Sequence, residues 1–144
     1  MRAFLFELEE ILRVRRFEQQ QAEIELGKAV AAENEIQSKL DALAMRQAAV
    51  KNQTAGSTQF SDIAAASQFY SFVRAQSECL LNELAGAKLV SDEKREILRQ
   101  AMQKVDSLEK LKEQQRALYM EELLHEEENE LDDIVTSRFK PGNE

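Results

Sequence analysis

Apolar residues recur along this chain in alternating steps of three and four. In residues 5–50, ten of the fourteen positions on this ladder are apolar. A 3.5-residue period keeps one stripe of side chains facing a partner helix, so this stretch predicts one helix of a coiled coil. The first ladder consists of Leu5, Leu8, Leu12, Arg15, Gln19, Ala22, Leu26, Ala29, Glu33, Ile36, Leu40, Leu43, Gln47 and Val50.

A cluster of small and polar residues at positions 52–58 interrupts this pattern and contains Gly56. Such a cluster predicts a turn. We expect the second helix to begin near Ser61, where Ser61 and Asp62 offer side-chain oxygens to the unpaired amides of the first helical turn.

The same ladder resumes after the turn, with eleven of fourteen positions apolar. A short loop makes the two helices antiparallel, and facing residues should have numbers that sum to about 112. Val50 should then lie near Ile63, and Leu5 near Leu108. The second ladder consists of Ile63, Ala66, Tyr70, Val73, Ser77, Leu80, Leu84, Ala87, Ser91, Lys94, Leu98, Ala101, Val105 and Leu108.

The phase of the ladder breaks after Leu108, since Leu111 follows by three after another step of three, and later apolar residues no longer continue one seam. We interpret the break as the end of intramolecular pairing. The predicted fold is all-α: a single antiparallel coiled-coil hairpin, with helix one at about 4–52, a turn at 53–60, a longer helix two at 61–138 and a tail at 139–144. Helix two should be about 115 Å long and helix one about 70 Å. The C-terminal part of helix two should therefore project as an overhang that binds a partner or a second copy.

Gly27 and Gly86 should fall at nearly the same level of this hairpin. One interpretation is that both glycines are simply tolerated, at a cost of roughly 1 kcal/mol each relative to alanine. The other is a close approach of the helices, or a bend, at that level.

Composition limits the partners that the hairpin can have. The net charge of −8 argues against nucleic acid and anionic membrane surfaces. The single cysteine, Cys79, cannot form an internal disulfide, and it should be a partly buried, inert thiol in a reducing cytoplasm. Acidic residues interrupt the apolar N-terminal run before it reaches the length of a signal peptide or membrane span.

The chain offers little catalytic or metal-binding chemistry. Glu122 and His125 have the Glu-x-x-His spacing of di-iron bundles, but that motif must occur twice and the chain has one histidine. The four glycines are isolated, so no phosphate-binding loop is present, and a two-helix hairpin has no concavity for a catalytic triad. We expect a protein that is not an enzyme and has no cofactor or metal.

Two surface features suggest contacts with partners. Residues 94–116 contain a basic stretch, whereas residues 121–133 hold eight acids and no Lys or Arg. These runs are either solvated helix faces or an electrostatically steered docking surface. Phe60, Phe69 and Phe72 lie off the second ladder, where they either broaden the core or form an aromatic patch for a partner.

The order and spacing of several motifs resemble the FliJ family of the bacterial flagellar type III export apparatus, over nearly the whole chain. The motifs are Phe4-Leu5-Phe6-Glu7-Leu8-Glu9 with Leu12 and Arg13, the turn near Gly56, Lys94-Arg95-Glu96-Ile97-Leu98-Arg99-Gln100-Ala101, Leu108-Glu109-Lys110-Leu111-Lys112-Glu113 and Glu130-Leu131-Asp132-Asp133.

This resemblance implies a cytoplasmic, non-enzymatic component that acts like a central stalk. It would bind and stimulate the hexameric export ATPase, and contact the cytoplasmic domain of the export gate and the export chaperones. Its association with the membrane would be peripheral, through protein contacts only. By resemblance, Phe4, Phe6, Leu108 and Leu111 would contact the ATPase, whereas Leu40, Leu43, Phe69, Phe72 and Gln76 would contact the gate.

Two other functions remain open. A generic structural or adaptor coiled coil would form a homodimer through residues 109–138. A cytosolic chaperone would instead use the aromatic patch to hold unfolded export clients.

Overall fold

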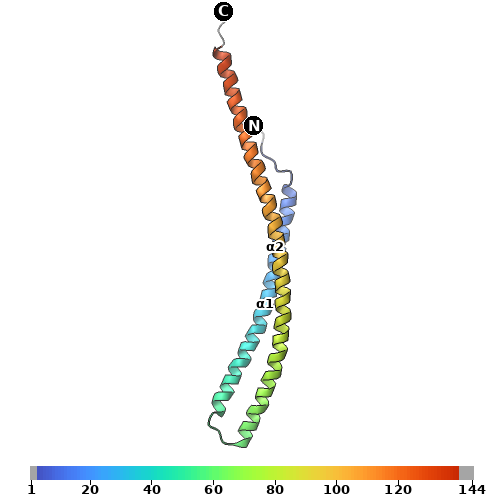
Figure 1. Cartoon of the computed structure of the whole chain (residues 1–144), viewed down its shortest axis with the longest axis vertical. Helices are drawn as coiled ribbons and strands as arrows, with labels where there is room; N and C mark the ends of the chain where they lie inside the picture. The colour runs from blue at the N-terminus through green and yellow to red at the C-terminus, as the bar shows by residue number, and fades with distance from the viewer. Residues whose placement is uncertain (1–2, 140–144) are drawn as a thin grey trace, which may run out of the picture. The chain divides into compact units, whose positions relative to one another are not determined.

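The computed structural model describes residues 3–139, which form two helices, α1 (Glu9–Thr54) and α2 (Phe60–Phe139). The helices run in opposite directions on either side of a short turn (Figure 1). This arrangement confirms the all-α hairpin, with α2 the longer helix at 80 residues against 46. Neither helix has an apolar stretch suited to crossing a membrane, within the part of the chain that the structure describes.

The turn is built from the small polar residues that predicted it. The Thr54 hydroxyl donates to the Val50 carbonyl at 2.9 Å, and the Ser57 amide donates to the Thr54 carbonyl at 3.1 Å. Gly56 has a φ of 81°, a left-handed conformation that glycine adopts without a steric penalty. These contacts end α1 and reverse the chain within five residues.

The second helix begins one residue earlier than predicted. The Ile63 amide donates to the Gln59 carbonyl at 3.2 Å, so the helical hydrogen bonds are established before Ser61. The Asp62 carboxylate instead accepts a hydrogen bond from the Ser57 hydroxyl at 2.9 Å. Asp62 therefore ties the turn to the first helical turn of α2.

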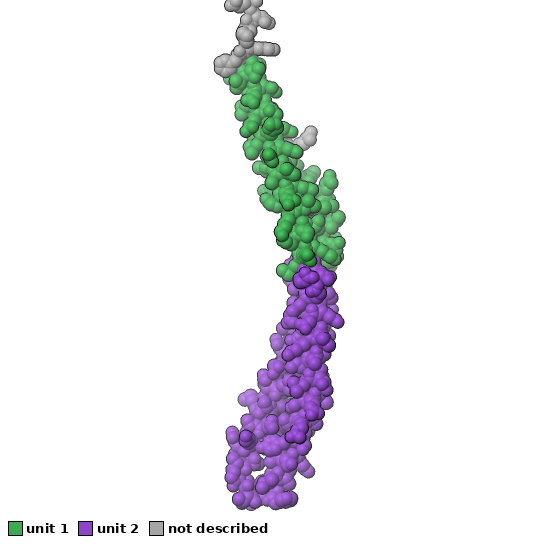
Figure 2. Space-filling view, viewed as in Figure 1, with its two compact units in different colours: residues 1–18, 101–144 green, residues 19–100 purple. Residues whose placement is uncertain are grey.

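The chain forms two compact units (Figure 2). Unit 1 comprises residues 1–18 and 101–144, and unit 2 comprises residues 19–100. Each unit takes one stretch from each helix. The single-domain organisation expected from the sequence stays a prediction.

In unit 2, the predicted seam is the buried face of both helices. Its most buried side chains are short or slender, so the apolar core is thin. Two seam positions are exposed: Gln47, and Ile63 at 53%. Both lie near the turn, where a helix end has fewer neighbours to cover it. The buried side chains of this seam are Ala22, Ala29, Ala66, Val73, Leu84 and Ser91.

Polar contacts across unit 2 correct the predicted register. Ser91 on α2 donates a hydrogen bond to Glu33 on α1, and the Arg46 guanidinium lies 5.6 Å from the Phe69 ring centroid. Both pairs have residue numbers that sum to more than 112. The sums are 124 and 115, so the facing residues lie further along the chain than predicted, and the lean of side chains toward the N-terminus of their own helix accounts for only part of the difference.

The two central glycines do not mark a close helix approach. A methyl group built at Gly27 or Gly86 would meet no atom within 4 Å. The interpretation of close packing is therefore wrong, and both positions can accept a side chain.

In unit 1, α1 begins at Glu9 rather than near residue 4. Residues 3–6 have no regular secondary structure, and residues 7–8 form a turn. Phe4, Phe6 and Leu8 pack in one cluster with Val105 of α2, whereas Leu5 is 84% exposed. The expected pairing of Leu5 with Leu108 is wrong for this reason.

Candidate partner-binding surfaces

The first candidate surface lies in unit 1, where the N-terminal segment folds back on α2. The Glu9 amide donates to the Phe6 carbonyl at 3.1 Å, and the Leu12 amide donates to the Leu8 carbonyl at 2.9 Å. These bonds join the non-helical segment to the first turn of α1. Phe6 is 8% exposed and Leu12 is fully buried, and both pack against Val105 of α2.

All four residues predicted to contact the ATPase come together here. Phe4, Leu108 and Leu111 pack, half-buried, around the cluster that contains Phe6. These side chains mainly hold the N-terminal segment on α2, and their contact with the ATPase stays a prediction. Their substitution would therefore disturb the fold as well as any contact with a partner.

Tyr119 is a member of this surface that the sequence reasoning missed. Its ring centroid lies 5.6 Å from that of Phe4, in a tilted arrangement typical of aromatic pairs. Intramolecular contacts therefore continue beyond Leu108, where the phase break predicted that they would end. The signal was present in the spacing, since Tyr119 is on the same face of α2 as Leu108 and Leu111.

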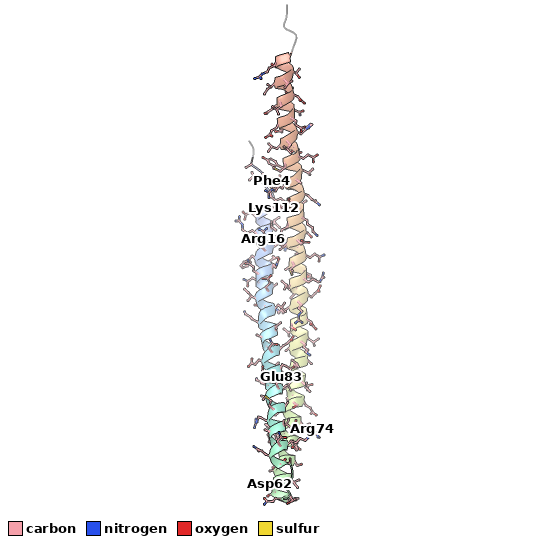
Figure 3. The ribbon with its side chains drawn as sticks, turned by 90° about the vertical axis from the view of Figure 1, so that its left-hand side faces the viewer. Phe4, Arg16, Asp62, Arg74, Glu83 and Lys112 are labelled. Carbon is pink, nitrogen blue, oxygen red and sulfur yellow. The ribbon has the colours of Figure 1, made fainter. Side chains whose placement is uncertain are left out.

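Two ion pairs connect α1 to α2 in the same region. Lys112 Nζ lies 2.8 Å from Glu9 Oε2, and Arg16 Nη2 lies 3.2 Å from Glu109 Oε1. Figure 3 shows Phe4, Lys112 and Arg16 close together at the start of α1. The hydrogen bond from Lys112 lowers the pKa of Glu9 from its ordinary value of 4.5, although partial desolvation acts in the opposite direction.

A groove of about 710 Å³ lies between the N-terminal segment and α2 in unit 1. Apolar and aromatic side chains, including Phe4, Leu5, Tyr119 and Leu123, form part of its wall. The remaining wall is acidic, from Glu122, Glu126, Glu127 and Glu130. Glu122 thus belongs to a polar groove wall, and no group of three or more metal-ligating side chains occurs among residues 3–139.

The second candidate surface lies in unit 2, near the turn, and contains the residues predicted to contact the gate. Phe69 is half-buried under Arg46, and its ring centroid lies 6.5 Å from that of Phe72. Phe72 is 49% exposed and Gln76 is exposed. Since they follow Phe69 by three and seven residues, these side chains share one face of α2.

Leu40 and Leu43 occupy the facing side of α1, but as half-buried seam residues. The structure therefore separates the predicted gate residues into an exposed face on α2 and seam positions on α1. Phe60, 84% exposed at the start of α2, adds aromatic surface at the turn. The expectation of a partly buried Cys79 is wrong, because its thiol lies on the exposed side of the helix beside Leu80.

A shallow groove of about 450 Å³ adjoins this second surface. Tyr70 of α2 and four residues of α1 line it, and none of these residues was predicted to be a contact. The α1 residues are Ala44, Gln47, Ala48 and Lys51.

Comparison with known families identifies a match over nearly the whole chain. The model described as "Flagellar FliJ protein" matches residues 4–144. No curated protein and no solved structure shows significant similarity to the chain.

Proposed function

Since the chain belongs to the FliJ family and is thereby a component of the flagellar export apparatus, we propose that it acts there as a stalk that binds and stimulates the hexameric export ATPase. The stalk contributes no catalytic group. It acts by presenting its surface to several ATPase subunits at once, which requires apolar contact positions outside its own seam.

The observation that carries this proposal is an exposed apolar stripe on α1 in unit 1. Val14 is 54% exposed and Phe17 is 60% exposed, and both point away from the seam that contains Leu12 and Arg15. Ile11 and Leu5 add apolar surface at 47% and 84% exposure. Solvated helix faces rarely concentrate so many large apolar side chains within a few turns.

The first test measures ATP hydrolysis by the export ATPase of the same organism, with and without this chain, together with gel filtration of the mixture. Stimulation and a larger complex are expected. The double variant Val14→Asp/Phe17→Asp should lose most of the stimulation, whereas Met45→Asp should retain it, because Met45 is 74% exposed in unit 2. Circular dichroism establishes that each variant remains helical.

Absence of both binding and stimulation with folded wild-type chain would contradict the stalk function. Full stimulation by the Val14→Asp/Phe17→Asp variant would show that the exposed stripe of α1 is not the contact.

The proposal extends to the export gate, with the contact on the exposed face of α2 near the turn. Phe72 and Gln76 would contact the gate domain directly, with Phe69 beside them on the same face of α2, and Leu40 and Leu43 would support them from the seam. The association with the membrane would then be peripheral, through protein contacts only. In a calorimetric titration with the cytoplasmic gate domain, Phe72→Ala should weaken binding, whereas Leu81→Ala, at a residue 54% exposed in the same unit, should not.

Family membership supports binding to export chaperones as well, which the same calorimetry can measure with each chaperone. A second candidate function is that of a holdase for unfolded clients, and the exposure of Phe60 and Phe72 favours it. Suppression of client aggregation by the wild-type chain and its loss in Phe60→Ser/Phe72→Ser would support the holdase. No suppression would exclude it.

A further inference from the structure

The distal part of α2, residues 113–138, continues past the start of α1 without a second helix beside it (Figure 1). Six large apolar side chains on this part are exposed by 49% to 61%. They are Leu118, Met120, Leu124, Leu131, Ile134 and Val135.

Four of these side chains form a new seam once the spacing is counted from Met120. Met120, Leu124, Glu127, Leu131 and Ile134 follow one another in steps of four, three, four and three. We call these five residues the distal stripe. A 3.5-residue period of this kind is the pattern of a helix that packs against another helix.

The four apolar side chains of the distal stripe do not line the groove beside the N-terminal segment, whereas Glu127 does, together with Tyr119 and Leu123. At about 100° per residue, the distal stripe is displaced from Tyr119 and Leu123 by roughly a quarter of a turn. The apolar positions of the stripe are therefore distinct from those that contact the N-terminal segment.

The acidic residues beside the distal stripe determine which kind of helix can pack on it. Glu121, Glu128 and Glu130 occupy positions immediately beside the seam, and residues 117–137 contain no Lys or Arg. None of the eight acids in residues 121–133 forms an ion pair within the described range 3–139. Flanking charges determine which helices pair, because like charges repel across the seam and opposite charges attract.

We infer that the distal stripe is a docking site for an amphipathic helix of another protein, with an apolar 3.5-residue seam flanked by Lys or Arg. A second copy of the stripe is disfavoured in either orientation, since both would carry acids at the flanking positions. The inference does not rest on the proposed function, because it uses no contact with the ATPase or the gate.

The test uses two synthetic peptides of about four heptads, identical in their Ile and Leu seam and carrying either Lys or Glu at the flanking positions. Fluorescence anisotropy measures their binding to the full chain at low and high salt. The Lys peptide should bind and the Glu peptide should not. Added salt should weaken the binding of the Lys peptide.

Three variants locate the contact. Leu124→Ser/Leu131→Ser should weaken binding of the Lys peptide by about tenfold or more, because two seam side chains are lost. Leu118→Ser is the matched control, since Leu118 is 59% exposed on the opposite side of the helix, and it should bind normally. The reversal Glu121→Lys/Glu128→Lys/Glu130→Lys should switch the preference to the Glu peptide.

Failure of both peptides to bind, or equal binding of both, would overturn the inference. So would a dimer of the free chain in sedimentation experiments that Leu124→Ser/Leu131→Ser converts to a monomer, because the occupant would then be a second copy. All substituted side chains are exposed, so unchanged helicity by circular dichroism excludes unfolding as the cause of lost binding.

Discussion

The Ser91 hydroxyl on α2 donates a hydrogen bond to the Glu33 carboxylate on α1, at a seam position where Ser91 is completely buried. The same hydroxyl accepts a hydrogen bond from Arg95 at 3.3 Å and lies 3.1 Å from the Lys88 carbonyl. A buried polar pair in a mainly apolar seam helps to fix the register of two helices, because a shifted pairing would leave its members without partners.

Ser91→Ala should destabilise the hairpin by about 1 kcal/mol, the usual net contribution of one hydrogen bond. Replacing both partners, in Ser91→Ala/Glu33→Leu, should recover that stability or exceed it, because apolar packing replaces the polar layer. Urea denaturation followed by circular dichroism measures both. A double variant less stable than Ser91→Ala alone would contradict this account of the pair.

Phe6 and Leu5 are adjacent in the N-terminal segment but differ in burial, so their alanine variants should differ in stability. Phe6→Ala should destabilise the attachment of the segment by about 3 kcal/mol, since it empties a buried aromatic site. Leu5→Ala should have an effect within about 0.5 kcal/mol, because Leu5 is 84% exposed.

Hydrogen exchange of the amides of Glu9 and Leu12 measures this attachment, because these amides bond to Phe6 and Leu8. Exchange should accelerate in Phe6→Ala and stay near the wild-type rate in Leu5→Ala. Equal protection in both variants would mean that the aromatic cluster does not hold the segment.

The Glu9–Lys112 ion pair should make this attachment sensitive to acid. The pKa of Glu9 is lower in the folded protein than its ordinary value of 4.5, so the folded state favours the charged form. Its contribution to stability is complete above about pH 4.5 and is lost as the pH falls through the lowered folded value. Amide exchange at Leu12, measured between pH 6 and pH 3, should show this loss in the wild-type chain.

Glu9→Gln is the control for the acid effect, since it removes the titrating group and keeps the size of the side chain. Its Leu12 amide should be less protected at pH 6 and should change less on acidification. An identical pH profile in both proteins would assign the acid effect to other carboxylates.

The glycines should respond to alanine in opposite directions. Gly27→Ala and Gly86→Ala should each stabilise the chain by up to about 1 kcal/mol, because both are helical and have open space for a methyl group. Gly56→Ala should destabilise the turn by about 1 kcal/mol, because its φ is positive. Thermal unfolding of the three variants tests this, and destabilisation at Gly27 or Gly86 would revive the close-approach interpretation.

The sequence by itself determined the two helices, the turn and most of the seam. The 3.5-residue ladder predicted the burial of Leu12, Ala22, Val73, Leu84 and Val105, and the structure confirms each one. This was possible because helix periodicity and turn chemistry are local properties, written in residues close together in the chain.

Only the tertiary structure decided how the ends and the polar positions are used. Phe4 and Phe6 would lie on different faces of a helix, and they share one cluster here because their segment is not helical and packs against α2. The partnership of Glu33 with Ser91 was likewise absent from the sequence pattern, and the spacing placed Tyr119 on the face of Leu108 without identifying Phe4 as its neighbour. Such pairings depend on side-chain direction and register across the hairpin, and only the folded chain brings those residues together.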